Sequence, residues 1–91
     1  MNLYRISQTV NDGYDTYDSA IVAAPDEATA RKIHPSASGD LRMWVDGSDN
    51  KDWIGHYPTW APHPDAVTAT LIGIATASVP MGTVLASFNA G

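Results

Sequence analysis

One segment of the chain, residues 35–65, limits the possible folds more than any other, because it has neither the period of a helix nor that of a strand. It contains all three tryptophans and four of the six prolines. A small domain seldom leaves so long a connection without structure, since ordering it costs backbone entropy that only packing or binding can offset. We therefore expect this tryptophan segment either to complete the core or to form a binding surface.

Alternating patterns before the tryptophan segment predict a β-hairpin. Residues 3–10 alternate between apolar and polar side chains, which is the period of a half-buried strand. Residues 11–18 begin with Asn, Asp and Gly, as is typical of a hairpin loop. The short apolar run at residues 19–24 suits the returning strand. These two strands should therefore pair antiparallel.

A short helix is predicted at residues 25–33. Pro25 suits the first helical position, and Asp26 and Glu27 place negative charge at the positive end of the helix dipole. Pro35 ends the helix. A helix of this length can cover only a small part of a sheet.

Two further strands are predicted after the tryptophan segment. Residues 66–75 alternate again, and residues 83–88 form the last strand after a turn at residues 80–82. The element order is β-β-α-loop-β-β. We predict a single α+β domain over residues 1–91, with a four-stranded antiparallel sheet, one short helix and a long loop rich in aromatic residues and proline.

The last two predicted strands carry apolar residues on both faces. Alternation places Ile72 and Ile74 on the face opposite Leu71. A single short helix cannot shield both faces of a four-stranded sheet. We expect the second face to be covered by the tryptophan segment, by a second copy of the chain or by a target, and we expect a homodimer.

Charge and composition exclude several classes of function. Ten acidic and five basic residues give a net charge of −5, which repels phosphate backbones, so we expect no direct nucleic-acid binding. The absence of cysteine removes disulfides and thiolate metal ligands and fits a reducing compartment. No apolar run approaches a membrane span and no signal-peptide pattern opens the chain, so we expect a cytoplasmic protein without membrane contact.

The predicted hairpin loop gathers carboxylates and phenols at one end of the sheet. The candidate partner-binding residues here are Asp12, Tyr14, Asp15, Tyr17 and Asp18. They could grip a basic patch on a partner, ligate a hard cation or hold a small polar ligand between the tyrosines. Alternatively, they form a solvated hairpin whose carboxylates accept backbone hydrogen bonds. We expect no metal, because calcium needs roughly six or more oxygen ligands in defined positions.

The aromatic and proline-rich stretch at residues 53–64 is the second candidate for recognition. Trp53, Tyr57 and Trp60 are its candidate partner-binding residues, because such side chains bury a large area with few rotatable bonds. The alternative is a role in the core. The chain has one phenylalanine, so a core short of large side chains could use the indole rings instead.

No catalytic or metal-binding signature is present. Residues 46–57 superficially resemble a calcium-binding loop, but Lys51 stands where glycine is needed and Tyr57 where a bidentate glutamate is needed. The spacing of the three histidines matches no zinc ligand pair. Neither a strained nucleophile turn nor a glycine-rich phosphate loop occurs. We predict a protein that is not an enzyme and has no cofactor.

Both ends of the chain resemble small uncharacterised proteins encoded by bacteriophages and prophages. The resemblance lies in Tyr-Arg-Ile-Ser-Gln at residues 4–8, in residues 11–20 and in Leu-Ala-Ser-Phe-Asn-Ala-Gly at residues 85–91. It implies a context: small acidic phage proteins outside the virion often inhibit host defence, and anti-CRISPR proteins are the best-known class. It assigns no chemistry to any residue.

The leading functional hypothesis is a phage accessory protein that inhibits a host defence complex by binding a basic protein surface, in the manner of anti-CRISPR proteins. The acidic balance, the low share of charged residues and the aromatic stretch motivate it. Two alternatives stay open. One is an oligomer that sequesters a small ligand in a pocket between subunits, lined by the tyrosines and backbone groups of the first loop and by Ser87, Phe88 and Asn89. The other is a small structural or assembly protein of a virion.

Overall fold

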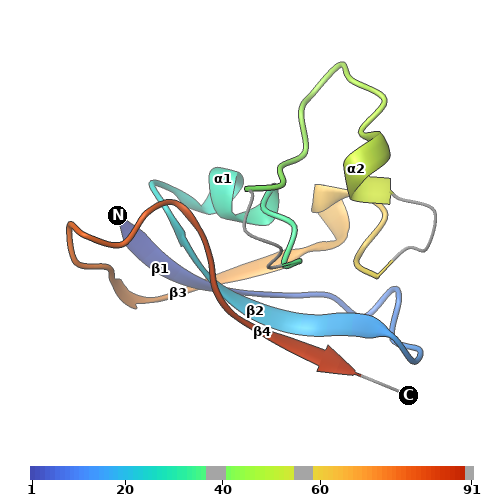
Figure 1. Ribbon diagram of the computed structural model, residues 1–91, viewed down its shortest axis with the longest axis horizontal. Coiled ribbons are helices and arrows are strands. Elements are labelled where there is room, and N and C mark those ends of the chain that lie inside the picture. The colour runs from blue at the N-terminus through green and yellow to red at the C-terminus, as the bar shows by residue number, and fades with distance from the viewer. Residues whose placement is uncertain (37–40, 55–58, 90–91) are drawn as a thin grey trace.

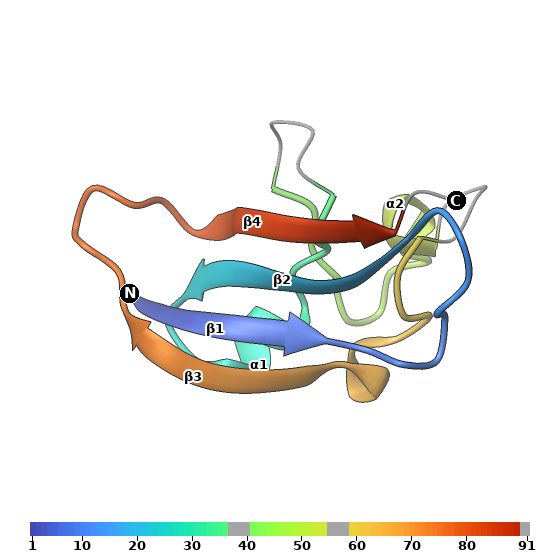
Figure 2. The same cartoon turned by 90° about the horizontal axis from the view of Figure 1, so that it is seen from below.

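The computed structural model describes residues 1–36, 41–54 and 59–89. Within them the chain forms one four-stranded sheet in the order β3-β1-β2-β4, in which every neighbouring pair is antiparallel (Figures 1 and 2). The strands are β1 (Asn2–Ser7), β2 (Thr16–Ala24), β3 (Thr68–Ile74) and β4 (Gly82–Asn89). The predicted fold class, a small α+β fold built on a four-stranded antiparallel sheet, is confirmed.

The helix α1 (Glu27–Arg31) is shorter than the predicted one. Asp26 has extended backbone and caps the helix, because its Oδ1 accepts a hydrogen bond from the Thr29 N–H at 2.7 Å. That hydrogen bond lowers the pKa of the Asp26 carboxyl from its ordinary value. Ile33 lies beyond the helix and pairs with Met43 in an isolated antiparallel bridge. The bridge joins the end of α1 to the tryptophan segment.

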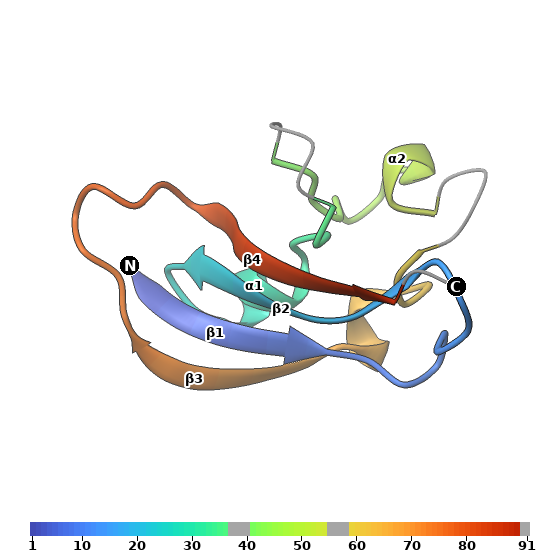
Figure 3. The same cartoon turned by 60° about the horizontal axis from the view of Figure 1, so that its bottom comes forward.

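The core lies between one face of the sheet and a single covering layer. This layer consists of α1 and the tryptophan segment, which lie on the same side of the sheet (Figures 1 and 3). Trp60 and Trp53 are only 2% and 3% exposed and belong to the same buried cluster as Ile6 of β1 and Val22 of β2. The indole rings thus supply the bulk that the short helix lacks.

Two helical turns in the tryptophan segment, α2 (Lys51–Ile54) and the 3₁₀ helix η1 (Pro64–Ala66), were not predicted. Before α2, the Asn50 side chain accepts from the Val45 N–H at 2.7 Å and donates to the Val45 carbonyl at 3.0 Å. Asn50 itself has a φ of 51°, a left-handed conformation that asparagine tolerates. A single turn contains too few residues to produce a visible period.

The second face of the sheet has no covering layer among the described residues (Figure 2). The side chains that the pairing register places there are mixed. Leu3, Ile21, Ala23 and Leu85 are apolar, and the others are polar and let that part of the face meet water. The polar ones are Arg5, Ser7, Ser19, Thr68, Thr70 and Ser87. Of the three candidates to cover this face, the tryptophan segment is excluded, because Trp53 and Trp60 pack on the same face as α1.

Two bulges explain why both faces of the last strands looked apolar in the sequence. Ile72 in β3 and Val84 in β4 have no partner in the register and so break the alternation. After the bulge at Ile72, the side chains of β3 alternate in the opposite phase. Ile74 therefore lies on the same face as Leu71 instead of the opposite face. Both edge strands nevertheless keep exposed apolar side chains, with Ile74 at 80% and Leu85 at 68%.

Candidate protein-binding surface

The β1–β2 connection is an ordered loop held by one buried side chain. The Gln8 amide donates to the carbonyls of Asn11 and Tyr17 at 2.6 and 2.9 Å, and its oxygen accepts from the Asn11 N–H at 2.8 Å. The Thr16 hydroxyl donates to the Gly13 carbonyl at 2.6 Å. These bonds satisfy polar groups on both sides of the turn, so the loop has a defined shape.

The end of β4 fastens to this loop. The Asp15 N–H donates to the Asn89 carbonyl at 2.6 Å, and the Asn89 amide donates back to the Gly13 carbonyl at 3.3 Å. Asp15 has a φ of 59°, a left-handed conformation that aspartate tolerates better than most residues. Residues from the two ends of the described chain therefore form one continuous surface.

Five of the eight predicted site residues lie in the β1–β2 loop or at the start of β2. Asp12, Tyr14, Asp15 and Asp18 are exposed, with Tyr14 at 79%. Tyr17 is half-buried and packs against the core. The Tyr17 side chain therefore packs beneath the loop and leaves only part of its area for a partner.

Phe88 lies next to this loop, although it was not among the predicted partner-binding residues. It pairs with Tyr17 across β2 and β4, and the two ring centroids lie 4.8 Å apart. About half of Phe88 remains exposed. The sequence signal for this contact was weak, because it depends on the long-range pairing of the first hairpin with the last strand.

The predicted residues of the tryptophan segment lie elsewhere. Trp53 and Trp60 are buried in the core, which is the alternative role considered for them, and they offer no surface to a partner. The Trp53 Nε1–H donates to the Ala61 carbonyl at 2.9 Å inside this core. Tyr57 lies outside the described residues, so its role as a site residue stays a prediction.

Three exposed carboxylates lie in and next to the loop: Asp12 and Asp15 belong to the loop, and Asp18 belongs to β2. No basic side chain of the described residues forms an ion pair with Asp12, Asp15 or Asp18. Elsewhere in the described chain, acidic side chains such as Asp46 pair with a nearby lysine. The loop is therefore a local concentration of unpaired negative charge around an exposed phenol. We name Asp12, Tyr14, Asp15, Asp18 and Phe88 the acidic loop surface.

The described residues were also compared with the features of metal sites, membrane spans and known proteins. No three His, Asp or Glu side chains gather there in an arrangement that could hold a metal ion. None of the helices in the described ranges is long and apolar enough to cross a membrane. Comparisons with protein-family models, curated proteins and solved structures gave no match.

Proposed function

We propose that this chain is a phage accessory protein that inhibits a host defence complex by binding a basic protein surface, in the manner of anti-CRISPR proteins. The observation that carries the protein-binding part is the acidic loop surface, where an ordered loop and the start of β2 present three carboxylates without ion pairs among the described residues, together with the exposed Tyr14. The phage context and the cytoplasm of the host as its location rest on the resemblance of the two chain ends.

Charge and shape support this mode of binding. The net charge of −5 attracts a basic partner over a distance and speeds encounter, with a strong dependence on salt. At short range, tyrosine and phenylalanine bury a large area at small cost in side-chain entropy, and tyrosine in particular is enriched at binding hot spots. Because Gln8 orders the loop before binding, little backbone entropy is lost on docking.

The test is a triple substitution that removes the loop charges without changing its shape. Asp12, Asp15 and Asp18 are replaced by asparagine, which tolerates the left-handed backbone of position 15. In a bacterium with active CRISPR interference, wild-type chain should raise the plating of a targeted phage and should capture a defence component identified by mass spectrometry. The triple variant should lose both effects.

A matched control separates the loop from net charge alone. Asp46, Asp49 and Asp65 lie on the exposed surface of the tryptophan segment, each within ion-pair distance of a basic side chain. Changing these three to asparagine alters net charge by the same amount and should leave inhibition intact. If the wild-type chain neither restores plating nor captures a defence component, the proposed function fails.

We also propose that two copies of the chain associate through an edge strand. Neither β3 nor β4 contains a charged residue or a proline, the usual devices that keep sheet edges apart. Leu85 of β4 is exposed, and Leu85→Lys should weaken pairing there. Light scattering at micromolar concentration should give the mass of a dimer for the wild type, and a monomeric mass would remove this proposal.

A further inference from the structure

The chain contains the dipeptide Asp–Gly twice, and both copies are exposed. Asp12–Gly13 lies in the β1–β2 loop, and Asp46–Gly47 lies in a turn of the tryptophan segment. An aspartyl side chain that precedes glycine can react with the backbone, because glycine has no side chain to shield its own amide nitrogen. The two copies share this chemistry, so the folded structure decides which of them reacts.

The reaction is an isomerisation that needs no cofactor. The glycine nitrogen attacks Cγ of the protonated aspartyl carboxyl group, a C–N bond forms, and one water leaves, made from the hydroxyl on Cγ and the proton on the nitrogen. The product is a succinimide ring. Water then reopens the ring, and when it breaks the bond between the nitrogen and the main-chain carbonyl carbon, the residue becomes isoaspartate. The mass of the protein is unchanged at the end.

The structure holds Asp46–Gly47 through both its side chain and its backbone. The Asp46 carboxylate accepts a hydrogen bond from the Lys32 Nζ at 3.0 Å. That bond lowers the pKa of the Asp46 carboxyl, so less of it is in the reactive protonated form at neutral pH. The Ser48 N–H donates to the Val45 carbonyl at 3.2 Å and closes the turn, in which Gly47 has the positive φ of 84° that its position requires.

Asp12–Gly13 lacks both restraints. The Asp12 carboxylate forms no ion pair with a basic side chain in the described ranges. The hydrogen bonds that order the loop use the groups on either side, the Asn11 backbone and the Gly13 carbonyl. The Gly13 N–H, whose nitrogen is the attacking atom, donates to no backbone carbonyl of the described residues. Both reacting groups are therefore available.

We infer that Asp12–Gly13 is a site of spontaneous isoaspartate formation in the native protein and that the fold protects Asp46–Gly47 from the same reaction. The product carries an additional methylene in the main chain between residues 12 and 13. The hydrogen bonds from Thr16 and Asn89 to the Gly13 carbonyl fit the ordinary chain length, so isoaspartate should weaken them. The new α-carboxylate suits enzymes that methylate isoaspartyl carboxyl groups. The reaction does not depend on the proposed protein partner.

Trypsin separates the two sites for measurement, because residues 6–31 and 43–51 fall on different peptides. After incubation of the folded protein at neutral pH, liquid chromatography with fragmentation mass spectrometry should show isoaspartate at residue 12 forming at least about threefold faster than at residue 46. In urea the two rates should converge, since the ion pair and the turn are lost. No isoaspartate at residue 12, equal rates in the folded protein, or an unchanged ratio in urea would overturn the inference.

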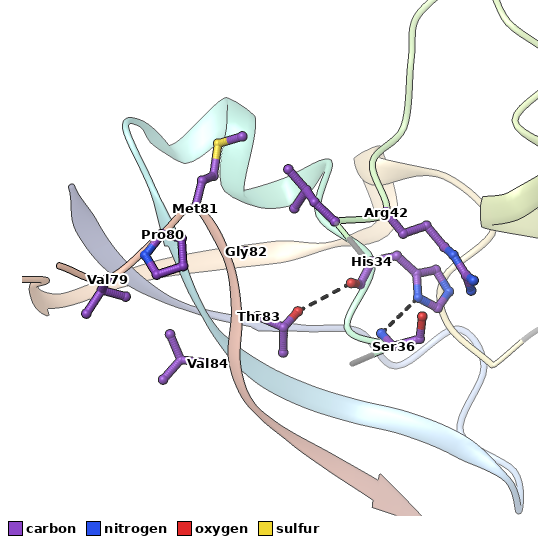
Figure 4. A pocket seen from close by; sticks show the side chains of 10 residues that line it. His34, Ser36, Arg42, Val79, Pro80, Met81, Gly82, Thr83 and Val84 are labelled. Carbon is purple, nitrogen blue, oxygen red and sulfur yellow. Dashed lines mark hydrogen bonds between the residues drawn. The ribbon is translucent and has the colours of Figure 1, made fainter. Parts of the chain in front are cut away.

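Gly13→Ala tests the attacking group without straining the loop. A Cβ at Gly13 would meet no atom within 4 Å, whereas Gly47 has a φ of +84°. Gly82 lines a pocket of about 410 Å³ at the beginning of β4, whose lining includes Arg42, and its Cβ would stand 3.4 Å from the Leu41 side chain (Figure 4). Gly13→Ala should slow isoaspartate formation at residue 12 several-fold and leave residue 46 unchanged. An unchanged rate at residue 12 would contradict the site.

Lys32→Gln tests the protection of the second site. It removes the ion pair of Asp46 and should raise the rate at residue 46 without changing that at residue 12. Arg31→Gln is the matched control, because it removes the same charge from a side chain that pairs with Glu27 instead and should change neither rate. An unchanged rate at residue 46 in Lys32→Gln would contradict protection by the ion pair. If Lys32→Gln does not fold, the wild-type rates with and without urea decide the matter.

Asp12→Asn supplies a positive control, because asparagine closes the same ring with loss of ammonia in place of water. It should yield the isoaspartyl peptide of residues 6–31 faster than the wild type does. The asparagine variants at positions 12 and 46 are therefore used freshly purified in the capture experiment. Slower formation in Asp12→Asn than in the wild type would contradict the succinimide route.

Discussion

The aromatic residues of the β1–β2 loop and those of the tryptophan segment lie in opposite environments. Tyr14 is 79% exposed among carboxylates, whereas Trp60 is 2% exposed beneath the sheet. Both regions are aromatic and irregular in sequence, and both were predicted to bind a partner. The difference shows that aromatic content alone does not identify a binding surface. What separates the two is whether the rest of the fold needs the ring to fill its core.

The largest expected effect is the loss of the buried indole at position 60. Trp60→Ala should lower the free energy of unfolding by about 3–5 kcal/mol, because it removes a large fully buried side chain and leaves a cavity. Urea denaturation followed by far-UV circular dichroism measures the change. A loss below about 1 kcal/mol would mean that the tryptophan segment is not the core layer described above.

Acid should destabilise the covering layer through His34. Its pKa lies near 4 in the folded protein because of burial and the Arg42 charge, against 6.5 ordinarily. Between pH 6.5 and 4 the unfolded chain binds a proton that the folded protein does not, so stability should fall by about 2–3 kcal/mol as pH decreases through this range. Above pH 6.5 this contribution should be constant.

The control for that pH dependence is His34→Gln, which cannot titrate. Its stability between pH 6.5 and 4 should be nearly flat, whatever its absolute value. Asp26 and Asp46 have lowered pKa values, because they accept hydrogen bonds from Thr29 and Lys32 respectively, so their stabilising contributions are lost at lower pH. A wild-type profile that is flat over the same range would contradict the buried, neutral state of His34.

A smaller effect distinguishes the two buried indoles from each other. The Trp53 Nε1–H donates to the Ala61 carbonyl, while the Trp60 Nε1–H is buried without a hydrogen-bond partner. Trp53→Phe removes a satisfied hydrogen bond and leaves a carbonyl unpaired, whereas Trp60→Phe removes an unsatisfied donor. Trp53→Phe should therefore cost about 1 kcal/mol more in urea denaturation. The reverse order would contradict these contacts.

The smallest expected change in stability lies in the loop. Tyr14→Ala should alter the free energy of unfolding by less than about 0.5 kcal/mol, because the ring is almost entirely exposed. The same variant should weaken capture of the partner, in contrast to Trp60→Phe, which should leave capture unchanged. If Tyr14→Ala lost stability but still captured the partner, the ring would have a structural role. That result would contradict the proposal that Tyr14 contacts the partner.

Much of the fold could be predicted because its signals are local. The alternation of Tyr4 and Ile6 with Arg5 and the cap chemistry around Asp26 act over a few residues, and the four strands, the helix and their order followed from them. The ends of the strands and of the helix were predicted less accurately. β2 begins at Thr16 because its pairing with β4 extends it into the predicted loop.

The candidate site was predictable in part for the same reason. Asp12, Tyr14, Asp15 and Asp18 are close in sequence, so the loop and the start of β2 keep them near one another, and all four are exposed. Phe88 was placed beside the first loop only in the alternative of a ligand-sequestering oligomer, where the two line a pocket between subunits. In the structure Phe88 contacts Tyr17 of the same chain, through the pairing of β2 with β4. The burial of Trp53 and Trp60 likewise depends on which face of the sheet the tryptophan segment covers.

The sequence alone was sufficient to predict the class of fold, the acidic charge and the position of the exposed loop. Strand period, helix caps and turn residues act between near neighbours, so they can be recognised in the sequence. Long-range packing set the rest: the bulges at Ile72 and Val84, the single covered face and the pocket beside Arg42. Each of these depends on pairing and burial between distant segments, and such contacts leave no periodic trace in the residues that make them.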